Sequence, residues 1–193
     1  MLENIYNRLP TSIRPYAKSL YIAISSTPRV SLHNRIGHAT TTDFKTWNRD
    51  PNNPVFAPAK NNTEWDGITA EDPDLICQND TFVMAYAGHG EFDWETKQIG
   101  IATSTDGSVW SRSDSNPVLS PGEPDEWHNR SVQNPAIVRR KNTFHMIFDG
   151  SDREHGWIGI GHATADDVSD WTYNAANPIL KLGASDSWDS EHV

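Results

Sequence analysis

The hexapeptide RIGHAT (residues 35–40) decides the fold, because the chain repeats it twice more. It returns as QIGIAT (98–103) and as GIGHAT (159–164), so the shared glycine recurs after 63 and then 61 residues. Self-similarity with a period of this order is typical of solenoids, propellers and other arrays of one structural unit. The sequence therefore predicts a chain built from repeated units.

Further landmarks keep the same distance from this hexapeptide to within one residue. A tryptophan follows the shared glycine by ten residues, an Asn-Pro pair comes next, and a second tryptophan precedes an Asp-Pro or Asn-Pro pair by seven residues. We interpret the first tryptophan of each unit as packing between units rather than as a site residue. The landmarks are Trp47, Trp110 and Trp171; Asn53-Pro54, Asn116-Pro117 and Asn177-Pro178; Trp65, Trp127 and Trp188; and, in two units only, Asp72-Pro73 and Asn134-Pro135.

Within each unit the sequence favours β-strands. Runs such as FVMAY (82–86) and FHMIF (144–148) are short and rich in aromatic and branched residues, and turn signals such as Asp106-Gly107 lie between such runs. No segment keeps apolar residues at helical spacing. About four antiparallel strands per unit make one propeller blade. We therefore predict an all-β propeller domain over residues 1–193, with units at about 10–64, 65–126 and 127–187, and the start of another at 188–193.

Composition narrows the classes of partner. Asp and Glu number 26 against 16 Lys and Arg, for a formal net charge of −10, which argues against a phosphate-backbone partner. The sequence contains no apolar run of membrane-spanning length, and residues 1–30 lack the pattern of a secretory signal. We therefore expect neither a nucleic-acid nor a membrane partner, and the compartment stays undetermined. The one cysteine, Cys77, leaves no intrachain disulfide to form.

Four segments carry a resemblance to a known group of enzymes. They are IGIATSTDGSVW (99–110), NPVL (116–119), EW (126–127) and NPAIV (134–138). Over roughly residues 20–193 the chain resembles the five-bladed β-propeller glycoside hydrolases of family 43, which include arabinanases, arabinofuranosidases and xylosidases, and the related fructosidases of family 32. The resemblance implies about three blades of that fold and hydrolysis of furanoside- or pentose-type bonds. It also implies that acids from different blades meet near the central axis.

The residues beside the repeated proline are the first candidates for that chemistry. Glycoside hydrolysis usually needs two carboxyl groups across the scissile bond. The second unit offers Asp72, preceded by Glu71, and we expect one of these neighbouring acids to have a raised pKa. The third unit has Gln133 and Asn134 there, which can bond sugar hydroxyls but cannot exchange protons. The corresponding position of the first unit is Leu9, so the family's acid pattern is only partly met.

Other candidates lie near this motif in sequence. Asp149 ends the strand that follows it, and Glu191 stands just before the place where the third unit would reach the motif; both are further candidate catalytic acids, with Glu154 a weaker one. Aromatic, acidic and histidine side chains next to the motif can contact a sugar, although the constant spacing of the tryptophans also suits a structural role. These candidate substrate-binding residues are Trp65, Asp66, His89, Trp127 and His128.

Two functions from different classes remain open. The first is a glycoside hydrolase, or a part of one, that binds a carbohydrate substrate. The second is a non-catalytic propeller module that binds carbohydrate or assembles into an oligomer. No cluster has the spacing of metal ligands, so we expect no cofactor, and calcium enters only through the resemblance. An open arc of blades would leave apolar faces uncovered, which predicts either a homo-oligomer or the missing remainder of the propeller.

Overall fold

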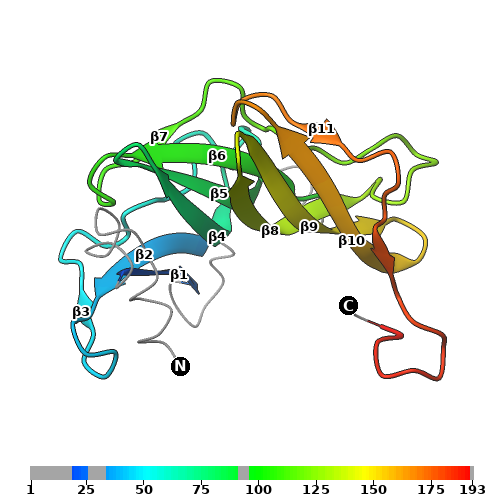
Figure 1. Cartoon of the computed structure of the whole chain (residues 1–193), viewed down its shortest axis with the longest axis horizontal. Coiled ribbons are helices and arrows are strands. Elements are labelled where there is room, and N and C mark those ends of the chain that lie inside the picture. The colour runs from blue at the N-terminus through cyan, green and yellow to red at the C-terminus, as the bar shows by residue number, and fades with distance from the viewer. Residues whose placement is uncertain (1–18, 26–33, 91–95, 192–193) are drawn as a thin grey trace.

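The computed structural model describes residues 19–25, 34–90 and 96–191, which form strands, turns and loops without any helix. Three antiparallel sheets follow one another along an arc (Figure 1). This confirms an all-β chain with about three propeller blades, and no described element is a helix able to cross a membrane. The first blade contains β1 (Ser19–Ser25), β2 (Asn34–Thr40) and β3 (Asn48–Arg49). The second contains β4 (Thr69–Gln78), β5 (Thr81–His89), β6 (Gln98–Ser104) and β7 (Ser111–Arg112). The third contains β8 (Ser131–Arg140), β9 (Thr143–Asp152), β10 (Gly156–Ala165) and β11 (Thr172–Tyr173), and β12 (Leu180–Lys181) also pairs with β10.

The register shows which strands are equivalent. The repeated glycine faces the preceding strand in the same way in each blade, in the pairs Ile22–Gly37, Tyr86–Gly100 and Phe148–Gly161. Strands β1 to β3 therefore correspond to β5–β7 and to β9–β11. β4 packs against β1 and β2 on one side and β8 on the other, so β4 and β8 are the inner strands. The corresponding position of the first blade, which contains Leu9, lies outside the described residues.

The repeated Asn-Pro pair has one structural task in all three blades. The side chain of Asn116 accepts a hydrogen bond from the Ile101 amide at 2.8 Å and donates one to the Ile101 carbonyl at 2.9 Å. Asn53 and Asn177 make the same two bonds to His38 and His162. Each asparagine side chain thus bonds β2, β6 or β10 as a neighbouring strand would. It satisfies two backbone groups that lie beyond the pairing with the short outer strand.

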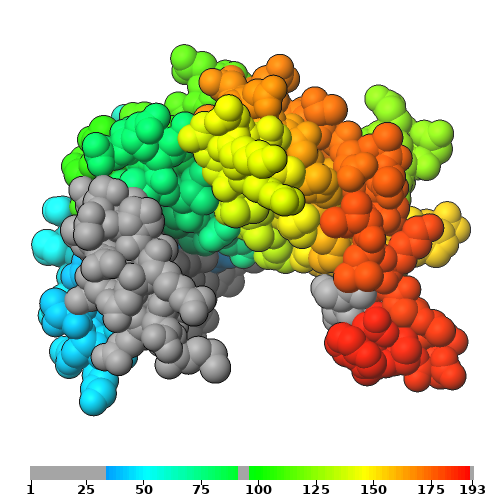
Figure 2. Space-filling model, viewed as in Figure 1, coloured from blue at the N-terminus to red at the C-terminus, as the bar shows by residue number. Residues whose placement is uncertain are grey.

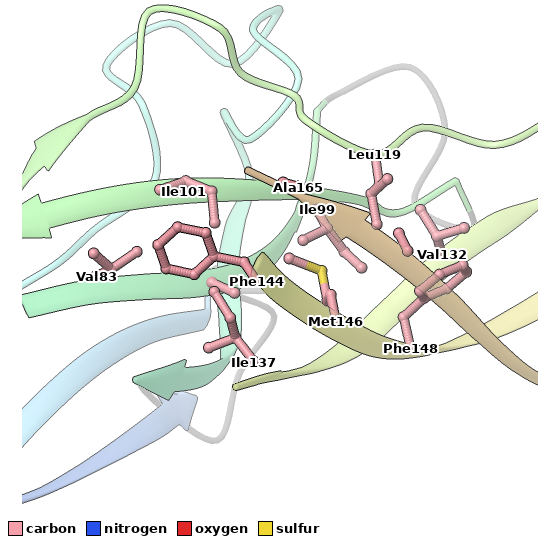
Figure 3. Close-up of a cluster of buried hydrophobic side chains, with 12 residues drawn as sticks. Val83, Ile99, Ile101, Leu119, Val132, Ile137, Phe144, Met146, Phe148 and Ala165 are labelled. Carbon is pink, nitrogen blue, oxygen red and sulfur yellow. The ribbon is translucent and has the colours of Figure 1, made fainter. Parts of the chain in front are cut away.

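The hydrophobic core lies between the blades. One cluster joins the second and third blades, and Figure 3 shows its side chains meeting from both sheets. A second, smaller cluster joins Ile36 and Phe56 of the first blade to Met84 and Tyr86 of the second. The larger cluster consists of Val83, Ala85, Ile99, Ile101, Leu119, Val132, Ile137, Phe144, Met146, Phe148, Ala163 and Ala165. The buried core is therefore shared between neighbouring blades, as in other repeat proteins.

The face of the third blade that looks away from the second is exposed. Leu119 is 2% exposed, whereas its equivalent Leu180 is 54% exposed. Trp188, the equivalent of Trp65 and Trp127, is 94% exposed. In Figure 2 the C-terminal segment, in red, lies at the opposite end of the arc from β2 and β3, in blue and cyan.

Candidate active site

Both inner strands carry a bulge at the repeated proline. The pairing of β4 with β5 shifts between Glu71 and Asp74, and that of β8 with β9 shifts between Gln133 and Ala136. The residues before the two prolines, Asp72 and Asn134, have positive φ angles of 52° and 51°. Asp and Asn tolerate this left-handed conformation better than most residues, and bulges of this kind redirect a side chain away from the ladder. The Asp-Pro and Asn-Pro motifs are therefore a repeated backbone device.

The two bulged segments are tied together across the blade interface. Asp74 of β4 accepts a hydrogen bond from the backbone amide of Ile137 in β8, with an N to Oδ2 distance of 2.7 Å. Val132 of β8 donates its amide to the carbonyl of Lys97 at 3.1 Å. The motifs of the second and third blades consequently have a fixed position relative to each other.

Glu71 is almost fully buried and has several partners. Its Oε1 lies 2.8 Å from Nζ of Lys97 and 3.4 Å from Oγ1 of Thr69, and its Oε2 accepts a hydrogen bond from the side chain of Asn34. Buried carboxylates are tolerated when they are paired and hydrogen-bonded in this way. Glu71 therefore holds a fixed negative charge next to Asp72.

Asp72 is the titratable group that this environment perturbs most clearly. Its burial and the charge of Glu71 raise its pKa, Lys97 opposes the rise, and the charge of Asp149 adds to it, so that the pKa reaches about 6. Burial and like charges both disfavour an ionised carboxyl group. Asp72 can therefore hold a proton in mildly acidic solution, while an ordinary aspartate cannot. The expected raised pKa falls on Asp72.

Asp149 and Asn134 form the third-blade part of the group. Asn134 donates its Nδ2 to Oδ2 of Asp149 at 2.6 Å. Asp149 lies on β9 opposite Gln133, and the equivalent residue of the second blade, opposite Glu71, is Ala87. The third blade thus carries amides on its inner strand and a carboxylate on the next strand. We define the axial cluster as Glu71, Asp72, Lys97, Gln133, Asn134 and Asp149.

The structure places two further candidates of the second blade in its interior. Asp66 is fully buried and accepts hydrogen bonds from Tyr86 Oη at 2.9 Å and Arg112 Nε at 2.8 Å. Trp65 packs against Tyr86, and a side chain at Gly100 would collide with its ring. Neither residue belongs to the axial cluster.

His89 and His128 are also buried. His89 sits at the end of β5, opposite Thr69, with its Nδ1 3.0 Å from the carbonyl of Gly90. His128 stands where the second blade has Asp66, and its ring packs against Tyr173, 4.9 Å between centroids. Neither nitrogen of His128 has a hydrogen-bond partner. Burial therefore lowers the pKa of His128, against the opposing charge of Glu126.

Of the remaining candidates, Trp127 is half-buried at the edge of the core, and Glu154 and Glu191 are exposed. Trp127 packs against Phe148 and leaves no room for a side chain at Gly150, while another part of it lines a surface hollow. Glu154 is exposed in the turn between β9 and β10, and Glu191 is exposed in the segment after β12. Among the residues that the structure describes, no three His, Cys, Asp or Glu side chains are grouped as metal ligands would be.

Sequence reasoning missed Lys97 and Asn34, the residues that bond Glu71. Both stand directly before the repeated hexapeptide, but the residue type there is not repeated, since the three copies have Asn34, Lys97 and Ile158. Their role follows from the packing of the first blade and the loop before β6 against β4. No spacing in the sequence indicates it.

Comparison with known proteins agrees with this fold. A β-fructofuranosidase of glycoside hydrolase family 32 from Bombyx mori superposes with a TM-score of 0.65 at 20% identity, over 87% of this chain and 33% of its own. A family 117 glycoside hydrolase from Zobellia galactanivorans gives 0.66 at 18% identity, over 83% of this chain and 47% of its own. Sucrose-6-phosphate hydrolase from Lactobacillus gasseri gives 0.65 at 17% identity, over 80% and 30%. The chain thus spans less than half of each of these structures.

The sequence itself gives a more specific result. A search of curated proteins found no significant match. The family model described as the N-terminal domain of glycosyl hydrolases family 32 matches residues 29–181, which include both inner-strand motifs and all three repeated hexapeptides. The chain therefore belongs to the N-terminal domains of glycosyl hydrolase family 32.

Proposed function

We propose that this domain hydrolyses furanoside-type glycosidic bonds, with Asp72 and Asp149 as its pair of carboxyl groups. The observation that carries the proposal is the raised pKa of Asp72, about 6, caused by burial and by the charges of Glu71 and Asp149. Glycosidases separate their two carboxyl groups by role, since one must be protonated while the other is ionised. The burial of Asp72 and the charges around it support its assignment as the protonated carboxyl group.

The second role falls to Asp149. Its Oδ2 accepts the short hydrogen bond from Asn134, and hydrogen bonds to a carboxylate favour its ionised form. In this proposal Asp72 donates its proton to the leaving oxygen, and Asp149 either attacks the sugar or activates water. Glu71 is a positioning residue, because its charge raises the pKa of Asp72 while Lys97 and Asn34 hold it in place.

The structural neighbours suggest which substrate to test first. They include a β-fructofuranosidase and a sucrose-6-phosphate hydrolase, so a β-fructofuranoside is the first choice. An aryl β-fructofuranoside reports cleavage directly, because its phenol is released on hydrolysis.

The decisive experiment compares wild type with Asp72→Asn on this substrate. We expect turnover to fall at least about 100-fold, as for loss of a general acid, with an unchanged circular dichroism spectrum. Asp170→Asn, an exposed aspartate on the loop before β11, is the matched control and should keep wild-type turnover. Equal turnover in Asp72→Asn and wild type would remove Asp72 from the mechanism.

A non-catalytic, sugar-binding domain is the second candidate. It is favoured by Gln133 and Asn134, the amide counterparts of Glu71 and Asp72 in the third blade. Amides bind hydroxyl groups but transfer no protons at neutral pH. Saturable binding of a fructofuranoside without any turnover would support this second function.

A further inference from the structure

The uncovered face of the third blade corresponds to a face that lies in the core in the second blade. There it packs against the third blade and consists of Val83, Ala85, Ile99, Ile101 and Leu119. The same positions of the third blade hold His145, Ile147, Ile160, His162 and Leu180. We call these five residues the open face. None of them is fully buried, so the third blade lacks the cover that the second blade has.

Two histidines of the open face bond each other. Nδ1 of His145 lies 3.0 Å from Nε2 of His162, and the two rings are nearly parallel, with 5.3 Å between their centroids. Asn174 fixes the direction of these bonds. Its Oδ1 accepts the amide of Ala176 at 2.9 Å, so its Nδ2 donates to Nδ1 of His162 at 3.1 Å. Nε2 of His162 therefore carries the hydrogen that His145 accepts, and both rings are neutral.

A further proton on either ring breaks this chain of hydrogen bonds, because Nδ1 is the accepting atom in both. Burial and the charge of His145 lower the pKa of His162. Among the residues that the structure describes, no carboxylate bonds either ring. The charged side chains on the elements around the pair are Arg140 of β8, Asp149 of β9, Asp166 after β10 and Lys181 of β12.

The first blade has a histidine at the same position, with a different partner. Nδ1 of His38 lies 3.1 Å from Oδ2 of Asp50, which stands where the third blade has Asn174. The second blade covers this pair, since Ser108 donates its hydroxyl group to Asp50 at 3.1 Å. A carboxylate can pair with a covered imidazolium, whereas the amide next to His162 cannot. Burial of an unpaired cation is costly, so only the neutral pair fits under a covering blade.

The first blade of the chain presents the complementary face. The side of the second blade that receives the first is built on Met84, Tyr86 and Ala102, all fully buried. The register places Leu20, Ile22 and Ala39 at the same positions of the first blade. Ala39 is partly exposed there, unlike Ala102. The first blade and the open face lie at opposite ends of the arc (Figure 1), so the two halves of this interface do not meet within one chain.

We propose that the open face binds the first blade of a second copy of this chain, head to tail, and that protonation of His145 and His162 weakens this contact. The contact repeats the one between successive blades of a single chain. It is heterologous, because different surfaces of the two copies meet. The proposal does not depend on the hydrolysis of any glycoside.

Two complementary variants test the head-to-tail geometry. Ala39→Glu places a charge on the receiving face, and Leu180→Glu places one on the open face. Sedimentation velocity at pH 8 should give wild type a mass of at least two chains, and each variant alone a mass of 21.6 kDa. Each contact needs one intact face of each kind, so an equimolar mixture of the two variants should form a one-to-one dimer.

Val109→Glu is the matched control, since Val109 is exposed by 72% on the loop between β6 and β7. It should associate like wild type. Association of Ala39→Glu alone would show that two open faces meet each other, and would overturn the head-to-tail contact. A monomeric wild type would overturn the second copy as the occupant and leave the face to another partner, such as a further blade.

The proton sensitivity is tested on the same chain without added charges. Association of wild type should be at least about tenfold weaker at pH 5 than at pH 8, because the covered histidines bind protons less readily than the uncovered ones. His145→Val with His162→Ile gives the open face the residues of the second blade. This variant should associate more tightly, and equally at both pH values.

His155→Gln is the control for the histidine pair, because it removes an exposed histidine in the turn between β9 and β10. It should keep the pH dependence of wild type. Asp72 also titrates in this range, but it is unchanged in both variants. The same pH dependence in wild type and in His145→Val with His162→Ile would overturn the role of the pair.

Discussion

Asn134 donates its side-chain amide to Asp149 across the third blade, with 2.6 Å between Nδ2 and Oδ2. The second blade has the opposite arrangement, in which the acids Glu71 and Asp72 lie on the inner strand and Ala87 occupies the position equivalent to Asp149. The two blades therefore contribute carboxylates from different strands. Their charges still interact, because Asp149 is one of the groups that raise the pKa of Asp72.

The hydrogen bond between Asn134 and Asp149 can be tested separately from the left-handed backbone conformation of Asn134. Asn134→Gly keeps the positive φ accessible and removes the amide, so we expect turnover on an aryl β-fructofuranoside to fall about tenfold while the melting temperature stays nearly constant. Asn134→Ala should lose the same activity and also about 1 kcal/mol of stability, since alanine is strained at this φ. Wild-type turnover in the glycine variant would show that the amide does not support Asp149.

The pH dependence of activity should report the pKa of Asp72. If Asp72 is the acid, kcat/KM falls as the pH rises through about 6. Glu71→Gln removes a charge that raises this pKa, so the descending limb should move to lower pH. Lys97→Met removes a charge that lowers it, so the limb should move to higher pH. Shifts of the same sign in both variants would contradict the assignment.

Ionisation of Asp72 should also lower the free energy of unfolding at high pH. Its pKa is about 6 in the folded protein and near the ordinary 3.8 when unfolded, so the folded state binds more protons between these values. Stability therefore decreases as the pH rises through this window, by about 3 kcal/mol at most. We expect Asp72→Asn to melt at a higher temperature than wild type at pH 8 and to lose this advantage near pH 4. The comparison needs only thermal unfolding curves at both pH values.

The ion pair between the buried Asp66 and Arg112 should contribute strongly to the free energy of unfolding. Arg112→Met leaves the Asp66 carboxylate buried without its cation and should reduce the free energy of unfolding by about 3 kcal/mol. The third blade has His128 and Tyr173 in the equivalent places, so the double variant with Asp66→His and Arg112→Tyr should be more stable than Arg112→Met alone. Urea unfolding of the three proteins checks both statements.

The uncovered face of the third blade should make the chain associate. Ile179, Leu180 and Trp188 are exposed there by 45%, 54% and 94%. Apolar surface of this kind marks an interaction site. We expect light scattering after size exclusion to give a mass above 21.6 kDa, and Leu180→Ser with Trp188→Ser to reduce it. A wild-type chain that stays monomeric at high concentration would show that this face needs no partner.

Most of the fold could be predicted from the sequence. The repeated hexapeptide and its landmarks are local patterns, and each has a local cause, such as the Asn116 amide that pairs with Ile101 or the glycine at position 100 that accommodates Trp65. Identical spacing places such residues at equivalent positions whatever the rest of the chain does. The two inner-strand motifs were found in the same way, since the proline marks the bulge in both β4 and β8.

The composition of the axial cluster was decided by the tertiary structure. Lys97 and Asn34 meet Glu71 from a loop and from another blade, and Asp149 acts on Asp72 from the next blade. Such contacts depend on how the blades pack: Asn34 and Lys97 share one repeat position, directly before the hexapeptide, but the spacing does not show that both reach the same carboxylate. Asp66 could not be placed from the sequence either. It lies near the motif in the chain, but only the folded structure shows that it is buried against Tyr86 and Arg112. Sequence alone determined which backbone positions are equivalent, and packing decided which charges face one another, because charge interactions depend on distances and burial that exist only in the folded chain.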